Sequence, residues 1–393
     1  MQDIEEICKV YGKTFPVLAP SHFQKMMSQV VPHSSGNVVP WHNVMPLSAY
    51  QVAKETQELF LTKIMGEINI DIDYYNLVYS KTRTIFNYLK PAKIDFVKHK
   101  VHCLHQENKS HLTNWTADKY GYLPVPEYSL CESVTGRMKI KSGPNILLLP
   151  KKFRDIIVSR FGKEGSIWYL DFTSLEPRVA LSVKSYISSG LLIGSVPHIK
   201  LLDLTSPEPL PKDIYSLALK TLKLSTEVSR ETIKQIVLSQ LYGQAKSLTI
   251  ETLEKYNVRG PDEVVDMVND FFGIDTLRQF ILQGYQKTSG TFLRTFYGRH
   301  LTPEDGKPHA LLNYYVQSTA VDVALLGFQK ILQKLSETPG AFEVIVPIFL
   351  LHDGLILDVH KDVEHLIPKL CSLGAKDIPG FKNQIFWMSG NKL

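Results

Sequence analysis

The chain has few cysteines and no long apolar run, and these two features argue against several classes of protein. Its 393 residues include four cysteines that lie far apart and form no CxxC spacing: Cys8, Cys103, Cys131 and Cys371. A zinc site and a disulfide framework are therefore not expected. No segment approaches the roughly 20 apolar residues of a membrane helix, and the first residues lack the basic and then apolar pattern of a secretion signal. We expect a cytoplasmic protein with no membrane partner.

A large excess of charge is also lacking, since the formal net charge is +5. Binding to a polyanion would have to depend on a local patch. Residues 137–163 supply one, with eight Lys and Arg residues against a single Asp. Arg137, Lys139 and Lys141 alternate, so in an extended strand they would share one face and could follow a line of phosphates. Taken alone, the charge run is also explained by an ordinary solvated surface.

The length is enough for two or three subdomains, and the 44% hydrophobic content is enough for a large core. Residues 1–45 are rich in loop-forming residues and predict an irregular lead-in. Helical spacing over 47–89 predicts two amphipathic helices, and residues 211–290 are mostly helical by pattern. Residues 344–393 return to β-like runs. The mixture indicates an α+β fold.

The first group of candidate residues is an apolar strand that ends at Asp171 and leads into a helix. Ser174 is a fair N-cap for that helix, and Pro177 falls in its first turn, where a missing N–H costs nothing. The end of a strand is a rigid place from which a carboxylate can bind a metal ion. Considered alone, an aspartate in this position is more often a turn or capping residue than a metal ligand.

The second group is a helical stripe. Steps of four residues place Arg230, Lys234, Leu238 and Tyr242 on one slowly drifting side of a helix. Two cations, an apolar residue and a ring could hold a triphosphate at one end and a base at the other. An ordinary amphipathic helix with solvated cations is the alternative.

The third group lies within residues 344–359, where two apolar β runs flank Asp353-Gly354. Asp-Gly predicts a tight hairpin. His352 and Asp353 would then lie between two buried strands, where polar groups are costly unless they are paired or used.

Together, the three groups resemble motifs A, B and C of the family A DNA polymerases, which include bacterial DNA polymerase I. Those motifs run Asp-Tyr-Ser-x-Ile-Glu-x-Arg, Arg-x3-Lys-x7-Tyr-Gly and His-Asp-Glu. The matching residues here are Asp171, Glu176, Arg178, Arg230, Lys234, Tyr242, Gly243, His352 and Asp353. Residues 135–145 and 313–320 resemble two further family segments, and Tyr297-Gly-Arg299 resembles the family's Phe-Gly-Arg.

The resemblance implies a DNA-directed DNA polymerase that extends a primer 3′-hydroxyl with dNTPs. Two Mg²⁺ ions, with Mn²⁺ as a substitute, would be held by Asp171, Asp353 and the backbone carbonyl of Phe172. Lys234 would be the general acid toward pyrophosphate. The nucleotide would contact Arg230, Lys234, Tyr242, Glu176, Leu238 and Tyr215. The DNA would contact Arg137, Lys139, Lys141, Arg178, Arg299, Asn313, Gln317 and His352.

Within this resemblance, Glu176 would crowd the 2′ position of the sugar and favour deoxynucleotides. Three positions depart from the family pattern: Gly354 replaces the glutamate of motif C, Leu238 replaces an aromatic residue, and Tyr215 replaces a phosphate-binding histidine. These changes indicate a divergent lineage, such as that of a phage or plasmid. Two alternatives stay open: an enzyme like the single-subunit RNA polymerases, and a degenerate DNA-binding accessory subunit.

The resemblance also predicts a right-hand architecture with an antiparallel palm sheet. After the lead-in at 1–45, the thumb would span 46–110, the palm 111–186 and 301–393, and the fingers 187–300. With only about 45 residues before the thumb, a proofreading exonuclease domain is not expected. The expected partners are primer–template DNA and dNTPs, with a separate exonuclease, helicase or primase chain left open. The expected location is the cytoplasm of a bacterium or of a phage-infected host.

Overall fold

The chain forms two compact units, Met1–Ile72 and Asp73–Leu393. The computed structural model describes residues 45–67, 75–104, 112, 114–130, 132–193, 196–197, 210–224, 228–303, 308–382 and 386–393. In the first unit, the described part contains one helix, α3 (Leu47–Glu67). The predicted irregular lead-in falls on residues 1–45, of which all but the last lie outside the described residues.

The centre of the second unit is an antiparallel four-stranded sheet in the order β10-β11-β5-β12. Its strands are β10 (Ile345–Leu350), β11 (Gly354–His360), β5 (Gly165–Phe172) and β12 (Met388–Lys392). The continuous apolar runs of β10 and β11 are buried along almost their whole length, which explains why they read as β in the sequence. The predicted antiparallel sheet is present and joins β5 with strands from residues 345–392, which lie far from it in the sequence.

The hairpin between β10 and β11 turns one residue earlier than Asp-Gly predicts. Leu351 and Gly354 exchange backbone hydrogen bonds, so His352 and Asp353 are the two residues of the turn. Gly354 is already in β11, directly opposite Asp171 of β5. The turn therefore places Asp353 beside the end of β5.

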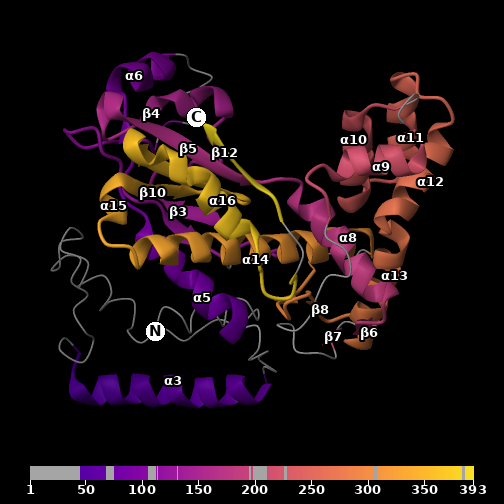
Figure 1. Cartoon of the computed structure of the whole chain (residues 1–393). Helices are drawn as coiled ribbons and strands as arrows, with labels where there is room; N and C mark the ends of the chain where they lie inside the picture. Colours follow the sequence, from indigo (N-terminus) through magenta and orange to yellow (C-terminus); the bar gives the residue numbers. More distant parts are fainter. Residues whose placement is uncertain are drawn as a thin grey trace. The chain divides into compact units, whose positions relative to one another are not determined.

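The two faces of the sheet pack against different partners. Helices α14 (Pro308–Ser336) and α16 (Ile367–Ala375) cover one face (Figure 1). The Phe172 ring packs against Phe328 of α14 on this face. On the other face, Ile356 and Trp115 belong to an apolar core that also includes residues of η4 (Lys151–Ile156), β1 (Lys93–Ile94) and β4 (Ile157–Val158). Because side chains alternate along a strand, Asp171 lies on the side opposite Phe172.

A second group of helices follows β5 and is called the helical lobe here. It consists of α8 (Leu175–Ser188), α9 (Ile214–Leu222), α10 (Arg230–Leu241), α11 (Lys246–Lys255), α12 (Pro261–Phe272) and α13 (Ile274–Lys287) (Figure 1). Asp213 caps α9 and Ser229 caps α10 through side-chain hydrogen bonds, so local sequence sets where these helices begin. Short β pairs flank the lobe: β6 (Leu192–Ile193) with β7 (Val196–Pro197), and β8 (Leu293–Arg294) with β9 (His300–Leu301).

The predicted thumb, 46–110, is divided between the two units. Only α3 is a long helix, and residues 75–104 of the second unit form η2 (Tyr75–Tyr79), α5 (Ser80–Thr82), η3 (Arg83–Tyr88), β1 and α6 (Phe96–Leu104). Ile94 joins the core beside the central sheet, and η3 and α5 contact α14. The second predicted amphipathic helix is thus a series of short helical segments, of which α5 and η3 pack against α14.

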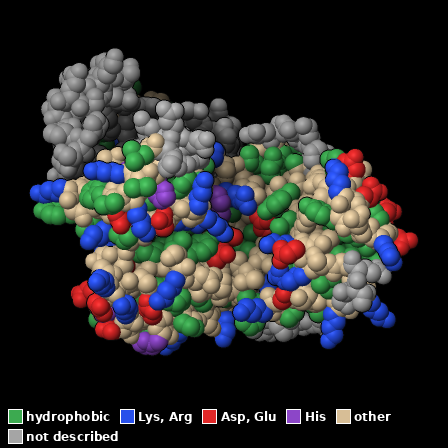
Figure 2. Space-filling model, turned by 90° about the horizontal axis from the view of Figure 1, so that it is seen from above, with side chains coloured by type: hydrophobic (Ala, Val, Ile, Leu, Met, Phe, Trp, Pro, Cys, Tyr) green, Lys and Arg blue, Asp and Glu red, His purple; other side chains and the backbone are tan. Residues whose placement is uncertain are grey.

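The charged surface is uneven. β3 (Lys139–Ser142) pairs with β2 (Glu127–Ser129), and Lys139 and Lys141 are exposed on it while Ile140 packs inward. The predicted strand is present for Lys139 and Lys141, whereas Arg137 precedes it and does not share their exposed face. At the outer end of the helical lobe, acidic side chains gather on α11 and α12 (Figure 2): Glu251, Glu254, Asp262, Glu263 and Asp266. In the described part of the chain, no helix is both long and apolar enough to cross a membrane.

Candidate active site

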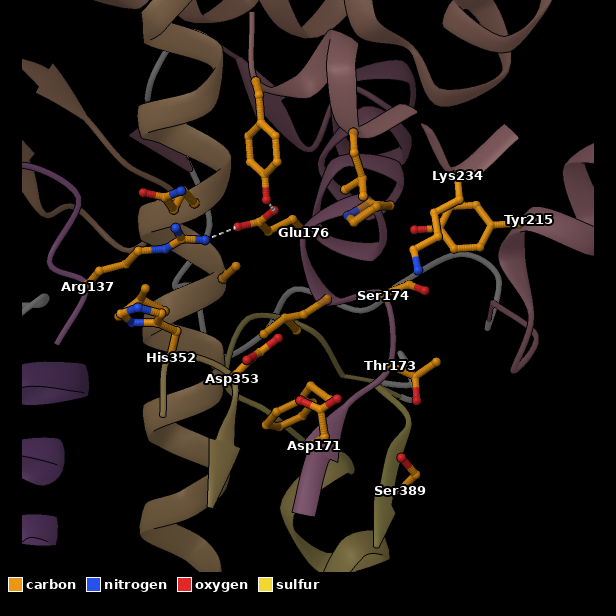
Figure 3. Close-up of a pocket in the computed structure, with 18 of the residues that line it drawn as sticks. Arg137, Asp171, Thr173, Ser174, Glu176, Tyr215, Lys234, His352, Asp353 and Ser389 are labelled. Carbon is orange, nitrogen blue, oxygen red and sulfur yellow. Dashed lines mark hydrogen bonds and ion pairs between the residues drawn. The ribbon is translucent and has the colours of Figure 1, made fainter. Parts of the chain in front are cut away.

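A cavity of about 490 Å³ lies where the central sheet meets the helical lobe. The end of β5, the β10–β11 turn, β12, α8, α9, α10 and α14 all contribute to its wall (Figure 3). The predicted site residues that line it are Arg137, Asp171, Phe172, Glu176, Tyr215, Arg230, Lys234, Leu238, Tyr242, Gln317, His352 and Asp353. The fold thus brings three sequence segments that are distant along the chain to a single hollow.

Two carboxylates form the floor of the cavity. Asp171 ends β5 and Asp353 belongs to the β10–β11 turn, and Figure 3 shows both side chains beside the open space. The Phe172 amide donates to the Asp353 carbonyl at 3.0 Å, which fixes the turn against the strand end. Burial and then the charge of Asp353 raise the pKa of Asp171 from 3.8 to about 7. Burial also raises the pKa of Asp353.

This carboxylate pair fits a divalent cation. Two like charges held together in a partly dry site repel one another, and a cation relieves that repulsion. Among the described residues, no group of three or more His, Cys, Asp and Glu side chains is arranged to hold a metal ion. Mg²⁺ is commonly bound by one or two carboxylates together with water and substrate phosphates, so the pair with the Phe172 carbonyl is a sufficient protein contribution.

Cations lie near these acids on the sheet side. The charges of Lys151 and Arg154 in η4 lower the pKa of Asp171, although burial outweighs them. Arg154 is itself buried, and its Nε donates to the Leu149 carbonyl at 3.4 Å. The basic segment therefore contributes to the electrostatics of the site as well as to the surface.

The α10 stripe is formed as the helical spacing predicts. Arg230, Lys234 and Leu238 project into the cavity from one side of α10, and Tyr242 follows the last helical residue. Lys234 approaches Glu231 at 3.8 Å and is otherwise exposed to the open side. Two cations of α10 thus line the same hollow as the two carboxylates.

Arg230 is oriented by neighbours that the sequence did not connect to it. Its Nε donates to Asp213 at 2.7 Å, its Nη1 donates to Glu231 at 2.6 Å, and its guanidinium stacks over the Tyr215 ring at 5.2 Å. Tyr215 is almost fully buried, and Ser174 lines the cavity beside it. Tyr215 supports Arg230 in this structure; its predicted contact with the nucleotide is untested.

Glu176 is the centre of a hydrogen-bond network across the cavity. One of its carboxylate oxygens accepts from Arg137 Nη2 at 2.9 Å and the other accepts from the Tyr242 hydroxyl at 2.6 Å (Figure 3). With the Gln317 amide nitrogen donating to Thr135 Oγ1 at 2.7 Å, its oxygen accepts from both Arg137 Nη atoms at 3.1 Å. The network joins α14, the segment before β3, α8 and the end of α10.

His352 is neutral near pH 7. Burial and then the charge of Arg137 lower its pKa to about 4. Its Nδ1 is buried and has no hydrogen-bond partner among the described residues. Figure 3 shows the ring beside Arg137, on the same side of the cavity as Asp353.

Arg178 was predicted to contact DNA, and its burial rules this out in the structure. It is fully buried, and its guanidinium donates to three backbone carbonyls: Thr173, Pro211 and Lys212. These bonds tie the turn after Asp171 to the segment that begins α9. Arg178 therefore holds together two backbone segments that border the site.

Arg299 was also predicted to contact DNA and is also buried. Its Nη2 donates to Asp322 of α14 at 2.5 Å, and Asp322 is itself fully buried. A Cβ on Gly136 would lie 1.9 Å from Arg299 Nη1, so the guanidinium packs directly against the turn that precedes Arg137. Arg299 positions that turn.

The remaining predicted contacts lie outside the cavity or act differently. Asn313 is partly exposed on α14 one turn before Gln317, and Lys139 and Lys141 are exposed on β3, so all three stay open as DNA contacts. Ser174 precedes α8 as predicted, but it has the left-handed conformation (φ 52°) and makes no side-chain cap.

Three residues near the acids escaped the sequence analysis. Tyr169 donates to Asp171, Asp213 holds Arg230, and Ser389 lines the cavity from β12 directly opposite Asp171. Tyr169 lies two residues before Asp171, so strand alternation was an available signal for it. No local pattern identifies Ser389, because only strand pairing brings β12 to β5.

Comparison with known proteins supports the fold. No protein-family model matches the chain, and no curated protein matches it either. Among solved structures, the chain is similar to the POL domain of Pol1 from M. smegmatis, determined in complex with DNA primer-template and dNTP, with a TM-score of 0.53 and 15% identity. All of this chain is covered, and it spans 63% of the other. The chain thus has an α+β fold, mostly helical with antiparallel sheets, that resembles the polymerase domain of a DNA polymerase I.

Proposed function

We propose that this protein is a template-directed DNA polymerase that extends a primer 3′-hydroxyl with dNTPs. The observation that carries the proposal is the meeting of Asp171 and Asp353 at the floor of a cavity whose opposite wall presents Arg230 and Lys234. This arrangement of acids and bases suits a nucleoside triphosphate bound with divalent cations. The similarity to a polymerase domain supports the same reading at the level of fold.

The reaction joins the primer 3′-oxygen to the α-phosphorus and breaks the bond between the α- and β-phosphates, so pyrophosphate leaves. Two Mg²⁺ ions held by Asp171, Asp353 and the Phe172 carbonyl would supply charge stabilisation for this in-line displacement. Arg230 and Lys234 would bind the β- and γ-phosphates, and the Lys234 ammonium would donate a proton to the leaving pyrophosphate. His352, which is neutral, and Arg137 would contact the primer end and its minor groove.

Glu176 would select the sugar. Its carboxylate is held in the cavity wall by Tyr242 and Arg137, so it cannot easily move aside for a 2′-hydroxyl. This fixed position favours a deoxynucleotide over a ribonucleotide. It also makes DNA synthesis a better proposal than RNA synthesis, although Gly354 echoes the small residue of the single-subunit RNA polymerases.

The deciding experiment is primer extension on one primer–template with Mg²⁺, comparing the wild type with Asp353→Ala. We expect the wild type to extend with dNTPs, and the variant to lose extension by at least about 10³-fold, a loss of the size that follows removal of a key charge-stabilising group. DNA affinity, measured by fluorescence anisotropy, should be unchanged. Extension by Asp353→Ala at the wild-type rate would refute the site.

The same assay separates the alternatives. Supplying rNTPs in place of dNTPs should give little product, and efficient extension with rNTPs would assign an RNA polymerase activity instead. DNA binding by the wild type without any extension would assign the accessory role. A partner exonuclease, helicase or primase chain remains a proposal that this assay does not require.

A further inference from the structure

Tyr169 makes a direct contact with one of the two acids of the site. It lies two residues before Asp171 on β5, so both side chains are on the same face of the sheet. The Tyr169 hydroxyl donates to Asp171 Oδ1 at 3.1 Å. One oxygen of that carboxylate therefore has a fixed protein partner before any ligand arrives.

The space that Tyr169 occupies exists because residue 354 is glycine. Gly354 pairs with Asp171 and Ile356 pairs with Tyr169, so Gly354 and Tyr169 are diagonal neighbours across the two strands. A Cβ on Gly354 would lie 2.2 Å from Tyr169 Cε2 and 2.5 Å from its hydroxyl oxygen. Gly354 does not have a left-handed backbone conformation, so the ring of Tyr169, and not the backbone, demands glycine here.

The Tyr169 ring is also held in place from behind. It packs against the apolar core on this face of the sheet, a core that includes Ile356 and Ile167. A hydroxyl on a packed aromatic ring has little freedom to leave its acceptor. The contact with Asp171 is thus a fixed feature of the sheet.

We propose that Tyr169 is a positioning residue that orients the Asp171 carboxylate for cation binding, in space that a side chain at position 354 would otherwise fill. The proposal rests on the proposed function, because it assumes that Asp171 binds a cation. A carboxylate has about four lone-pair sites, so accepting one hydrogen bond leaves others free for the metal. Hydrogen bonds to metal ligands commonly fix ligand orientation in this way.

Replacement of Tyr169 by Phe tests this directly, because it removes the hydroxyl and keeps the ring against Gly354. With Mn²⁺ alone as the probe, EPR titration should show about tenfold weaker binding in Tyr169→Phe, at the lower end of the 10–100-fold range for such partners. In extension assays, the Mn²⁺ concentration for half-maximal rate should rise by a similar factor while the KM for dNTP stays constant.

Tyr186→Phe is the matched control. Tyr186 is a buried tyrosine on α8 whose hydroxyl donates to the Gly380 carbonyl at 3.0 Å, and it is not part of the cavity wall. This control loses one buried hydrogen bond, as Tyr169→Phe does, and its Mn²⁺ affinity should match that of the wild type. Equal affinities in Tyr169→Phe and the wild type would overturn the proposal, as would an equal loss in both variants.

A second pair of variants tests whether Tyr169 occupies the space that a side chain at position 354 would otherwise fill. Gly354→Glu alone should displace the Tyr169 ring and weaken Mn²⁺ binding, whereas adding Tyr169→Ser to Gly354→Glu should make room for the new carboxylate and recover the affinity. If the Mn²⁺ affinity does not recover in the double variant, the two side chains do not compete for this space. A failure of the proposed function would look different, because the wild type would then bind Mn²⁺ more tightly than Tyr169→Phe and still give no primer extension.

Discussion

Asp171 is the residue whose pKa links the site to the stability of the fold. Burial and the Asp353 charge raise its pKa to about 7, so in the metal-free protein the carboxyl takes up a proton that the unfolded chain would release near pH 4. The folded state therefore binds more protons between about pH 4 and pH 7, and this group lowers stability progressively as the pH rises through that window. Above pH 7 the full cost is present.

Replacing Asp171 by Asn should remove this cost. We expect the metal-free Asp171→Asn variant to melt roughly 1–2 °C above the wild type at pH 8, a shift that corresponds to about 1 kcal/mol in a folded unit of this size and is modest because the side chain is partly exposed. The difference should disappear near pH 4. Thermal unfolding at both pH values, with a chelator present, measures it. A wild type more stable than Asp171→Asn at pH 8 would contradict the pKa assignment.

Burial decided the roles of two other residues. Arg178 and Arg299 match positions in the family motifs, but the sequence does not say that their guanidinium groups are enclosed by carbonyls and by Asp322. Arginine is common both at DNA surfaces and in buried ion pairs, so its identity alone cannot separate the two roles. The distinction needs the packing around it.

At the scale of elements, α10 is the clearest success of the sequence. A spacing of four residues is a local property of a helix, so the shared face of Arg230, Lys234 and Leu238 follows from the sequence alone. The surroundings of that face do not follow from the sequence. They depend on Asp213 and Tyr215 at the start of α9, which approach α10 only in the folded protein. The helix was predictable, and its electrostatic support was not.

Arg230→Ala should mainly weaken binding of the incoming nucleotide. We expect the KM for dNTP to rise by about tenfold or more, since charge-assisted bonds to phosphate contribute about 1.5–3 kcal/mol, while affinity for primer–template DNA stays unchanged. Steady-state extension kinetics measure the change. Arg259→Ala is the control, because Arg259 is an exposed arginine in the helical lobe that does not line the cavity. An unchanged KM in Arg230→Ala would remove Arg230 from the triphosphate site.

In the hairpin that carries Asp353, the sequence predicted the turn but not its register. The two apolar runs and the Asp-Gly pair predicted a tight turn, and the turn is present one residue earlier. The register is set by strand pairing, with Gly354 opposite Asp171 and its α-carbon against Tyr169. Turn propensity alone does not fix a register when a neighbouring strand imposes one.

At the scale of the whole molecule, a buried ion pair connects the long helix α14 with the β8–β9 turn, where Arg299 packs against Gly136. Breaking it should destabilise the fold, because Arg299→Ala would remove the guanidinium that pairs with the buried Asp322 carboxylate. We expect a loss of about 3–5 kcal/mol in the free energy of unfolding, measured from the urea midpoint and slope. Lys246→Ala, which removes an exposed bridge to Asp262 and Asp266, should cost less than about 1 kcal/mol. Equal losses of unfolding free energy in Arg299→Ala and Lys246→Ala would show that the buried pair contributes no more to stability than an exposed one.

Charge is also organised at this scale. Exposed cations lie on β3 near the cavity, and exposed acids lie on α11 and α12 at the outer end of the helical lobe (Figure 2). A polyanion bound to this protein would therefore be drawn to the sheet side and repelled from the outer helices. The net charge of +5 conceals this separation, which explains why composition gave little guidance.

The sequence by itself determined the chemistry available: two aspartates, two cations on one helical face, and the strands and helices that carry them, because alternation and helical periodicity are local properties. Only the tertiary structure decided that Asp171 and Asp353, 182 residues apart, share one cavity. It also decided that Tyr169 fills the space beside Gly354, and that Arg178 and Arg299 are enclosed. These outcomes depend on which strand pairs with which and on what packs behind them, and such long-range contacts leave no signature in local spacing.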